Sequence, residues 1–140
     1  MDKLTILEKI RERASSTLVG NLGIEITDIG EKHVSGKMPV DHRTKQPFGL
    51  LHGGASVALA ETLGSIGAGA QVNMDTHSVV GIEINASHIK AVKGGWVFGI
   101  AKAVRVGKKI QVWEITIKDD NDNAVCKSRL TLAVIKKYDK

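Results

Sequence analysis

This sequence has few cysteine and aromatic residues and no long apolar run. Cys126 is the single cysteine among 140 residues, which excludes an internal disulfide framework and a zinc site built from several cysteines. Five aromatic residues offer little surface on which nucleic-acid bases could stack. No uninterrupted run of about twenty apolar residues occurs, so a membrane span is not expected. We therefore expect neither nucleic acid nor a membrane as a partner.

The length and composition are those of one globular domain, which we expect to span residues 1–140. With 42% hydrophobic residues, a chain of this length can bury a core without a disulfide or a metal. Seven charged side chains lie within residues 2–13, unlike the apolar centre of a signal peptide. This predicts a cytoplasmic protein.

The pattern of apolar residues predicts a helix, two strands, a long helix and then four strands. Apolar residues at spacings of three and four predict an amphipathic helix over about residues 2–15. Two strand-like segments follow, one from Ile24 and one over about residues 33–40, and residues 41–50 are expected to form a loop. β-rich stretches separated by polar or Gly-containing turns predict the last four strands: residues 78–89, 95–106, 109–118 and 124–135. Because their connections are too short for parallel crossovers, we expect antiparallel pairing.

The segment from Gln46 to Met74 has an unusual composition. Eleven of its 29 residues are Gly or Ala, and Glu61 is its one formally charged residue. Its centre, about Gly53 to Gln71, predicts a helix that is apolar on nearly every side and buried on most of its surface. The many small residues predict close approach of other backbone. The order of elements favours an α+β architecture in which one curved antiparallel sheet wraps around this helix.

Glu61 is the strongest chemical signal in the sequence. A lone carboxylate in an otherwise uncharged helix is costly to bury unless it is paired, hydrogen-bonded or protonated. No Lys or Arg lies near it in the sequence. A helix face that reaches water would also explain this residue, but its apolar neighbours favour a general base or a nucleophile.

The start of the same helix, at His52 and Gly53, is a candidate site for a developing negative charge. Backbone N–H groups in the first turn of a helix have no partner within the helix, and glycine lets a ligand approach them closely. An oxyanion hole for a reacting carbonyl is one interpretation, and an ordinary turn is the other. Gln46, in the preceding loop, could donate its amide to the same carbonyl or simply face solvent.

His52 and Glu61 are nine residues apart, so about 13 Å separates their backbones along a helix axis. At that separation they cannot contact one carbonyl within one chain. If both act on the same substrate, the site combines Glu61 of one subunit with His52 of another, which two antiparallel helices about a two-fold axis allow. The sequence therefore indicates an obligate dimer.

Two patterns in the sequence resemble metal-binding motifs but lack the ligands or the spacing that such sites need. Residues 119–123 begin like a calcium loop, but no acidic residue stands at the twelfth position, so we expect a polar turn. His77, His88 and Cys126 lack the spacing of metal ligands. No metal site is therefore expected.

Three segments carry a family resemblance: TKQPFGLLHGGASVALAETLGS (44–65), VVGIEINASHIK (79–90) and VWEITI (112–117). With them, the chain closely resembles the hotdog-fold acyl-CoA thioesterases of the phenylacetate-degradation type, from about residue 17 to residue 135. Within that family it is similar to the bacterial hydrolases of 1,4-dihydroxy-2-naphthoyl-CoA and to the proofreading thioesterase of the enterobactin pathway. The resemblance implies a hotdog fold, in dimers that pair into a homotetramer.

The resemblance also implies catalytic roles. Glu61 matches the carboxylate that acts as nucleophile or as base for water, and the Gly53 N–H matches the backbone donor to the thioester oxygen. Gln46 matches the side chain that orients or polarises that group, and His52 matches the histidine that positions the thioester. Ser65 matches a polar residue that holds the attacking water, although a hydroxyl bonded to its own helix explains it nearly as well.

Residues for coenzyme A are implied in the same way. They are Val80, Gly81, His88 and Lys90, with Arg105, Gly107 and Lys108 near the nucleotide phosphates. Between Glu83 and Glu114 the sequence has six basic side chains and no acidic one, within a net charge of +5. We expect these cations to lie beside the nucleotide and to face its phosphates.

The resulting hypothesis is an acyl-CoA thioesterase that hydrolyses a thioester, with an aromatic acyl group, to a free acid and coenzyme A. Coenzyme A is part of the substrate and the product, so no cofactor is expected. Two alternatives stay open at this point. One is a hotdog enoyl-CoA hydratase or dehydratase, and the other is a non-catalytic acyl-CoA-binding protein.

Overall fold

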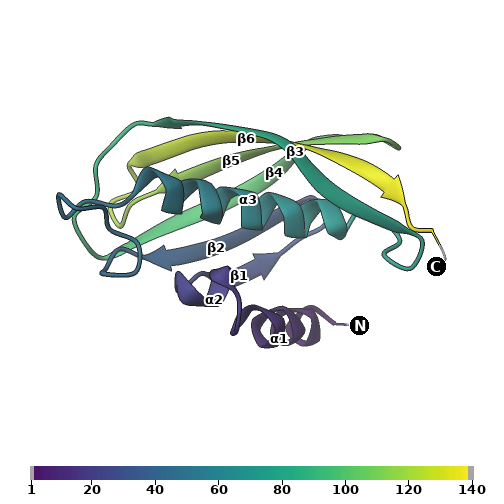
Figure 1. Ribbon diagram of the computed structural model, residues 1–140, viewed down its shortest axis with the longest axis horizontal. Helices are drawn as coiled ribbons and strands as arrows, with labels where there is room; N and C mark the ends of the chain where they lie inside the picture. The colour runs from purple at the N-terminus through teal and green to yellow at the C-terminus, as the bar shows by residue number, and fades with distance from the viewer. Residues whose placement is uncertain (1, 139–140) are drawn as a thin grey trace.

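The structure, a computed structural model, describes residues 2–138 (Figure 1). Its helices are α1 (Lys3–Ala14), α2 (Leu18–Asn21) and α3 (Gly53–Gly69). Its strands are β1 (Glu25–Ile29), β2 (His33–Pro39), β3 (His77–His88), β4 (Trp96–Val106), β5 (Ile110–Lys118) and β6 (Ala124–Lys136). Apart from α2, every element lies where the sequence pattern predicts it. The one-turn helix α2 is too short to show a helical period.

The six strands form one antiparallel sheet in the order β1-β2-β4-β5-β6-β3, which confirms the predicted antiparallel pairing. β3 pairs with β6 along its length, from His77 opposite Lys136 to His88 opposite Cys126. The other side of β3 has no neighbouring strand among the described residues. β3, the longer of the two edge strands, is therefore free to pair with a strand of another chain.

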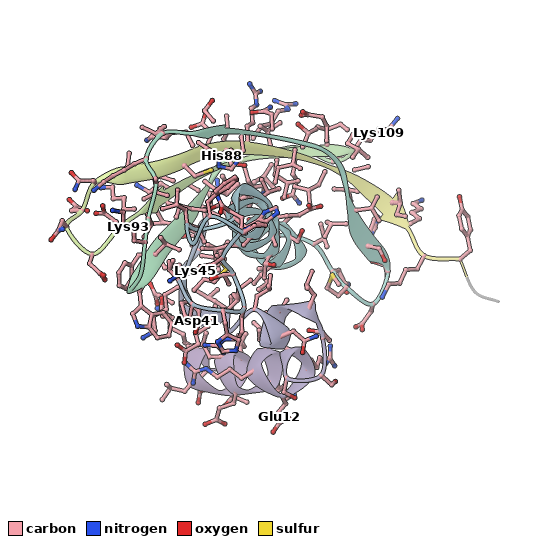
Figure 2. All side chains as sticks on the ribbon, turned by 60° about the vertical axis from the view of Figure 1, so that its left-hand side comes forward. Glu12, Asp41, Lys45, His88, Lys93 and Lys109 are labelled. Carbon is pink, nitrogen blue, oxygen red and sulfur yellow. The ribbon has the colours of Figure 1, made fainter. Side chains whose placement is uncertain are left out.

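The sheet curves around α3, and α1 lies beside β1 at the opposite edge from β3 (Figure 1). Figure 2, viewed more nearly along α3, shows the sheet arching over this helix with α1 and α2 below it. This is the α+β architecture that the order of elements predicted. None of the helices within residues 2–138 is long and apolar enough to cross a lipid bilayer.

The core lies between α3 and the concave face of the sheet. Leu59 and Leu63 of α3 are completely buried there, as is Trp113 of β5. The small residues of α3 permit close contact, as predicted, although their neighbours are side chains of the sheet rather than backbone. A β-carbon at Gly64 would come within 2.7 Å of Leu130, and one at Gly67 would come equally near the ring of Trp113.

One face of α3 is not covered by the sheet. Glu61, Thr62, Ser65 and Ile66 lie on this face and are half-buried. The prediction that the helix is buried on most of its surface therefore holds only for the sheet-facing side of a single chain. The carboxylate that the sequence singled out lies at the border of this face, where it meets Gly81 of the edge strand β3.

Candidate active site

The first turn of α3 presents one unpaired backbone donor. His52 is the N-cap of the helix, and its Nδ1 accepts a hydrogen bond of 2.7 Å from the Gly54 N–H. A ring nitrogen that accepts carries no proton, so a neutral imidazole here keeps its proton on Nε2. The Gly53 N–H donates to no acceptor within residues 2–138. The helix start therefore offers the donor that an oxyanion hole needs.

The loop before α3 holds Gln46 beside this helix start. The Gln46 N–H donates to the Leu50 carbonyl at 2.8 Å, and the Gly49 N–H donates to the Gln46 carbonyl at 2.9 Å. The side-chain Oε1 of Gln46 accepts from the Phe48 N–H. Because the oxygen is used inside the loop, the amide Nε2 is left to donate to another group.

Gln46 and Gly53 line a cavity of about 370 Å³ that also includes His88 and Lys90, from the end of β3 onward. The His88 imidazole lies over the helix start, since a β-carbon at position 53 would come within 2.9 Å of His88 Nε2. Any larger residue at position 53 would displace this ring. The structure thus brings together four of the predicted site residues.

Lys90 is not a free cation in this cavity. Its ammonium group pairs with Asp119 in the turn after β5, where 10% of the Asp119 side chain is exposed. Asp119 also accepts hydrogen bonds of 2.9 Å from the Asn121 and Asn123 N–H groups, which organises the predicted polar turn. The bond from Lys90, together with the backbone bond from Asn123, lowers the pKa of Asp119 to about 2.

The Glu61 carboxylate is half-buried and has no hydrogen bond or ion pair with another residue of the range 2–138. It lines a second cavity, of about 450 Å³, between α3 and the α1–α2 segment. The same cavity is lined by Ser65 and by the apolar side chains of Ile10, Val19 and Ile66. Arg13 and Thr62 line it as well, but no ion pair joins Arg13 to Glu61, so within the described residues the carboxylate is neither enclosed nor neutralised and faces a mainly apolar hollow.

The Ser65 hydroxyl is not tied to its own helix. Thr62, on the same face, donates to the Ala58 carbonyl at 2.6 Å, whereas no such bond forms from Ser65 within the described chain. The interpretation of Ser65 as a hydroxyl bonded to its own backbone is therefore not supported. Its role in holding water stays a prediction.

Two of the residues implied for coenzyme A lie near Glu61 instead. Gly81 faces the Glu61 carboxylate from β3, and the neighbouring Val80 is 42% exposed. Both lie in the half of β3 that is remote from His88. Their contact with coenzyme A therefore stays a prediction, whereas the contact between Gly81 and Glu61 is present in the chain.

The residues implied for the nucleotide phosphates lie at the far end of the sheet. The Gly107 N–H closes the β4–β5 turn by donating to the Ile110 carbonyl at 2.9 Å. Gly107 and Lys108 line a cavity of about 990 Å³ together with His77, the first residue of β3. His88, at the other end of β3, is eleven residues away, about 35 Å along an extended strand.

Within a single chain the six basic side chains do not form one surface, and their position beside the nucleotide stays a prediction. Lys93 and Lys109 lie on opposite sides of the view in Figure 2. Arg105, whose side chain lies beside Gly107, and Lys108 belong to the same end as Lys109, while Lys90 lies near the helix start and is paired. The six cations lie between residues 90 and 109 of the sequence, but the antiparallel strands distribute them along the sheet.

Two polar residues at or beside the cavity at the helix start were not among the predicted site residues: Asp119, which pairs with Lys90, and Ser56, which lines the cavity. Asp119 is 29 residues from Lys90, and such a long-range pair leaves no local signal. Ser56 is a small polar residue among the small apolar residues of α3. The feature of the sequence that could have identified Ser56 is its position, one turn after Gly53 on a helix predicted to be buried.

Known proteins share this chain's sequence over almost its full length. Residues 48–126 match the Thioesterase superfamily. A protein of Cronobacter turicensis named proofreading thioesterase EntH is 50% identical over 92% of this chain and 93% of its own. The 1,4-dihydroxy-2-naphthoyl-CoA hydrolase of Escherichia coli is 46% identical over 92% of this chain and 94% of its own. The chain belongs to the Thioesterase superfamily and is a thioester hydrolase.

Solved structures agree with this assignment. The thioesterase HI1161 of Haemophilus influenzae superposes with a TM-score of 0.89 at 47% identity, covering 93% of this chain and 90% of that one. The fold is thus the hotdog fold. Alanine variants of SAV0944 from Staphylococcus aureus, 37% identical, superpose with TM-scores of 0.84 (86% and 99% covered) and 0.82 (84% and 97% covered). One variant replaces a glutamate and the other a glutamine, at the same separation in sequence as Gln46 and Glu61.

Proposed function

We propose that this thioester hydrolase acts in the cytoplasm on an acyl-CoA with an aromatic acyl group and releases a free acid and coenzyme A. The relative named for 1,4-dihydroxy-2-naphthoyl-CoA supports an aromatic substrate. The 450 Å³ cavity beside Glu61 supports it as well, because its volume and its mainly apolar lining suit a ring. No carbon changes its oxidation state in this reaction, so water is the only co-reactant and coenzyme A is part of substrate and product.

The observation that carries the proposal is the unpaired Glu61 carboxylate on the open face of α3. Glu61 either attacks the thioester carbon, forming an anhydride that water then cleaves, or takes a proton from the attacking water. In both routes the C–S bond breaks, coenzyme A leaves as the thiol, and the carbonyl oxygen gains charge in the transition state. The Gly53 N–H and the Gln46 amide donate to that oxygen, while His52 positions the thioester and Ser65 holds the water.

One chain cannot supply both halves of this site, because Glu61 comes eight positions after Gly53 on α3, about 12 Å along the helix axis. We infer a homodimer formed through β3. On this strand Val80 and Ile82 are 42% and 57% exposed. Pairing two β3 strands about a two-fold axis joins the sheets and removes an edge that would otherwise invite aggregation.

The same dimer reunites the residues implied for coenzyme A. When two β3 strands pair antiparallel, the His77 end of one chain lies beside the His88 end of the other. Lys108, near His77, then approaches the cavity that contains Lys90 of the partner subunit. The resemblance supports pairing of two such dimers into a homotetramer, and light scattering tests it as a mass four times 15.0 kDa.

Thiol release from benzoyl-, dihydroxynaphthoyl-, phenylacetyl- and fatty acyl-CoA tests the proposed function. We expect the aromatic esters to be hydrolysed fastest and Glu61→Ala to abolish turnover while the oligomer stays intact. Retained hydrolysis in this variant would overturn the assignment of Glu61. Hydration of an enoyl-CoA without thiol release would identify a hydratase, and tight binding with neither reaction would identify a binding protein.

A further inference from the structure

One buried hydroxyl in the described part of the chain has no partner. Four polar side chains are buried: Thr44, Ser56, Gln111 and Ser128. Three of them donate to backbone carbonyls at 2.6 to 3.2 Å. Ser56 is the exception: it is 1% exposed, and its hydroxyl forms no hydrogen bond with any residue between 2 and 138.

The Ser56 hydroxyl opens onto the cavity at the start of α3. In the described part of the chain, every side-chain oxygen or nitrogen that is fully inaccessible has a hydrogen-bond partner. An unpartnered hydroxyl on so buried a residue must therefore direct its remaining accessible surface into free space. Ser56 lines the 370 Å³ cavity together with Gly53, Gln46 and His88.

The position of Ser56 relative to Gly53 favours a common ligand. The two residues are three apart on α3, so they lie on the same face of the helix, one above the other. The Gly53 N–H also lacks an acceptor within residues 2–138. Two neighbouring donors that the fold leaves unsatisfied, one of them almost completely buried, indicate a group that accepts from both.

Folding does not explain a serine at this position. An unsatisfied buried hydroxyl makes the folded state less stable than a methyl group of similar size would. Helix propensity also favours alanine over serine. The Ser56 hydroxyl is therefore better explained by a contact with a ligand in the cavity than by a contribution to the stability of the core.

We propose that Ser56 Oγ donates a hydrogen bond to the carbonyl oxygen of the bound thioester, as a second donor beside the Gly53 N–H; this rests on the proposed function. The bond strengthens as the oxygen gains negative charge, and the proton stays on Ser56 throughout. No base accepts from Ser56 within the described residues, so the hydroxyl is not activated as a nucleophile. Ser56 is then a catalytic residue that stabilises the transition state.

Ser56→Ala and Ser128→Ala form a matched pair for the test. Both remove one buried hydroxyl, but only Ser128 has an internal acceptor, the Asn85 carbonyl at 2.8 Å. We expect Ser56→Ala to lower kcat about 100-fold and leave the melting temperature unchanged or higher. Ser128→Ala should lower the melting temperature and leave kcat unchanged. Wild-type kcat in Ser56→Ala would overturn the proposal.

Binding of two inert analogues separates the carbonyl contact from catalysis. Phenacyl-CoA keeps a carbonyl, and the thioether 2-phenylethyl-CoA lacks one. Ser56→Ala should weaken binding of the first and leave binding of the second unchanged, while an equal effect on both would overturn the contact. If wild-type protein hydrolyses no acyl-CoA but shows this difference, the proposed function fails and the carbonyl contact stands. Failure of wild-type protein to bind either analogue would contradict both.

Discussion

The carboxylate of Glu61 lies directly against the α-carbon of Gly81. A β-carbon at position 81 would come within 2.9 Å of Glu61 Oε1, closer than real β-carbons approach other atoms. The pairing of β3 with β6 shifts register between Gly81 and Glu83, so the strand is irregular beside the carboxylate. The missing side chain of Gly81 thus leaves the space that Glu61 occupies.

Replacement of Gly81 with alanine should therefore impair catalysis without unfolding the protein. The new methyl group pushes the carboxylate away from its position, and a displacement of about 1 Å reduces kcat about 100-fold. Gly94→Ala is the matched control, because a β-carbon at position 94 meets nothing within 4 Å. Steady-state kinetics of the two variants test this, and wild-type kcat in Gly81→Ala would show that the position of Glu61 is not critical.

A site shared between two chains predicts complementation between inactive variants. Glu61→Ala and Gln46→Ala should each have little activity. In a heterodimer of the two, one site receives Glu61 and Gln46 from different chains and is intact, while the other lacks both. Random pairing on co-expression should restore about a quarter of wild-type activity. Activity no higher than the mean of the two variants would place both residues of a site in one chain.

Local patterns predicted most of the fold, because each element has its own sequence period. The small apolar residues of α3 and the β-rich segments from residue 78 onward identify elements one at a time. The place of β3 has no such signal. It pairs with β6, about fifty residues away, rather than with β4, the next strand in the chain. Only this pairing shows that β3 is an edge strand.

The candidate site divides in the same way. Glu61 and Gly53 were predictable because one is a lone charge and the other is a glycine at a helix start. The pairing of Lys90 with Asp119 was not, since it joins two segments that only the folded sheet brings together. The lack of a partner for Ser56 was also hidden, because it depends on every side chain around it.

The Lys90–Asp119 pair predicts how stability depends on pH. The pKa of Asp119 is lowered from 3.8 to about 2 in the folded chain, and the hydrogen bond from Lys90 is the largest cause. The pair therefore stabilises the folded state fully above pH 4, and this contribution is lost as the pH falls from about 4 to about 2. Asp119→Asn removes the titrating charge and should flatten the fall in stability over that range.

Urea unfolding of wild type and Asp119→Asn at several pH values between 6 and 2 measures this difference. The two curves should converge at the acid end, where Asp119 is protonated in both states of the wild type. Parallel curves across the whole range would show that the pair contributes no pH-dependent stability. The pKa of Asp28 is also lowered to about 2, by its bonds from Lys3 and His33. Asp28 is present in both proteins, so it adds the same pH dependence to the stability of each.

Two glycines near the end of α3 should respond oppositely to alanine. A β-carbon at Gly67 would lie 2.7 Å from the fully buried ring of Trp113, so Gly67→Ala overpacks the core and should lower the free energy of unfolding by about 1–3 kcal/mol. A β-carbon at Gly69 would meet its nearest atom, the Met74 sulfur, only at 3.8 Å. Gly69→Ala should therefore raise the free energy of unfolding by about 0.5–1 kcal/mol, because alanine favours the helix. Denaturant unfolding of both variants measures the two effects, and destabilisation by both would mean that this end of α3 tolerates no side chain at either position.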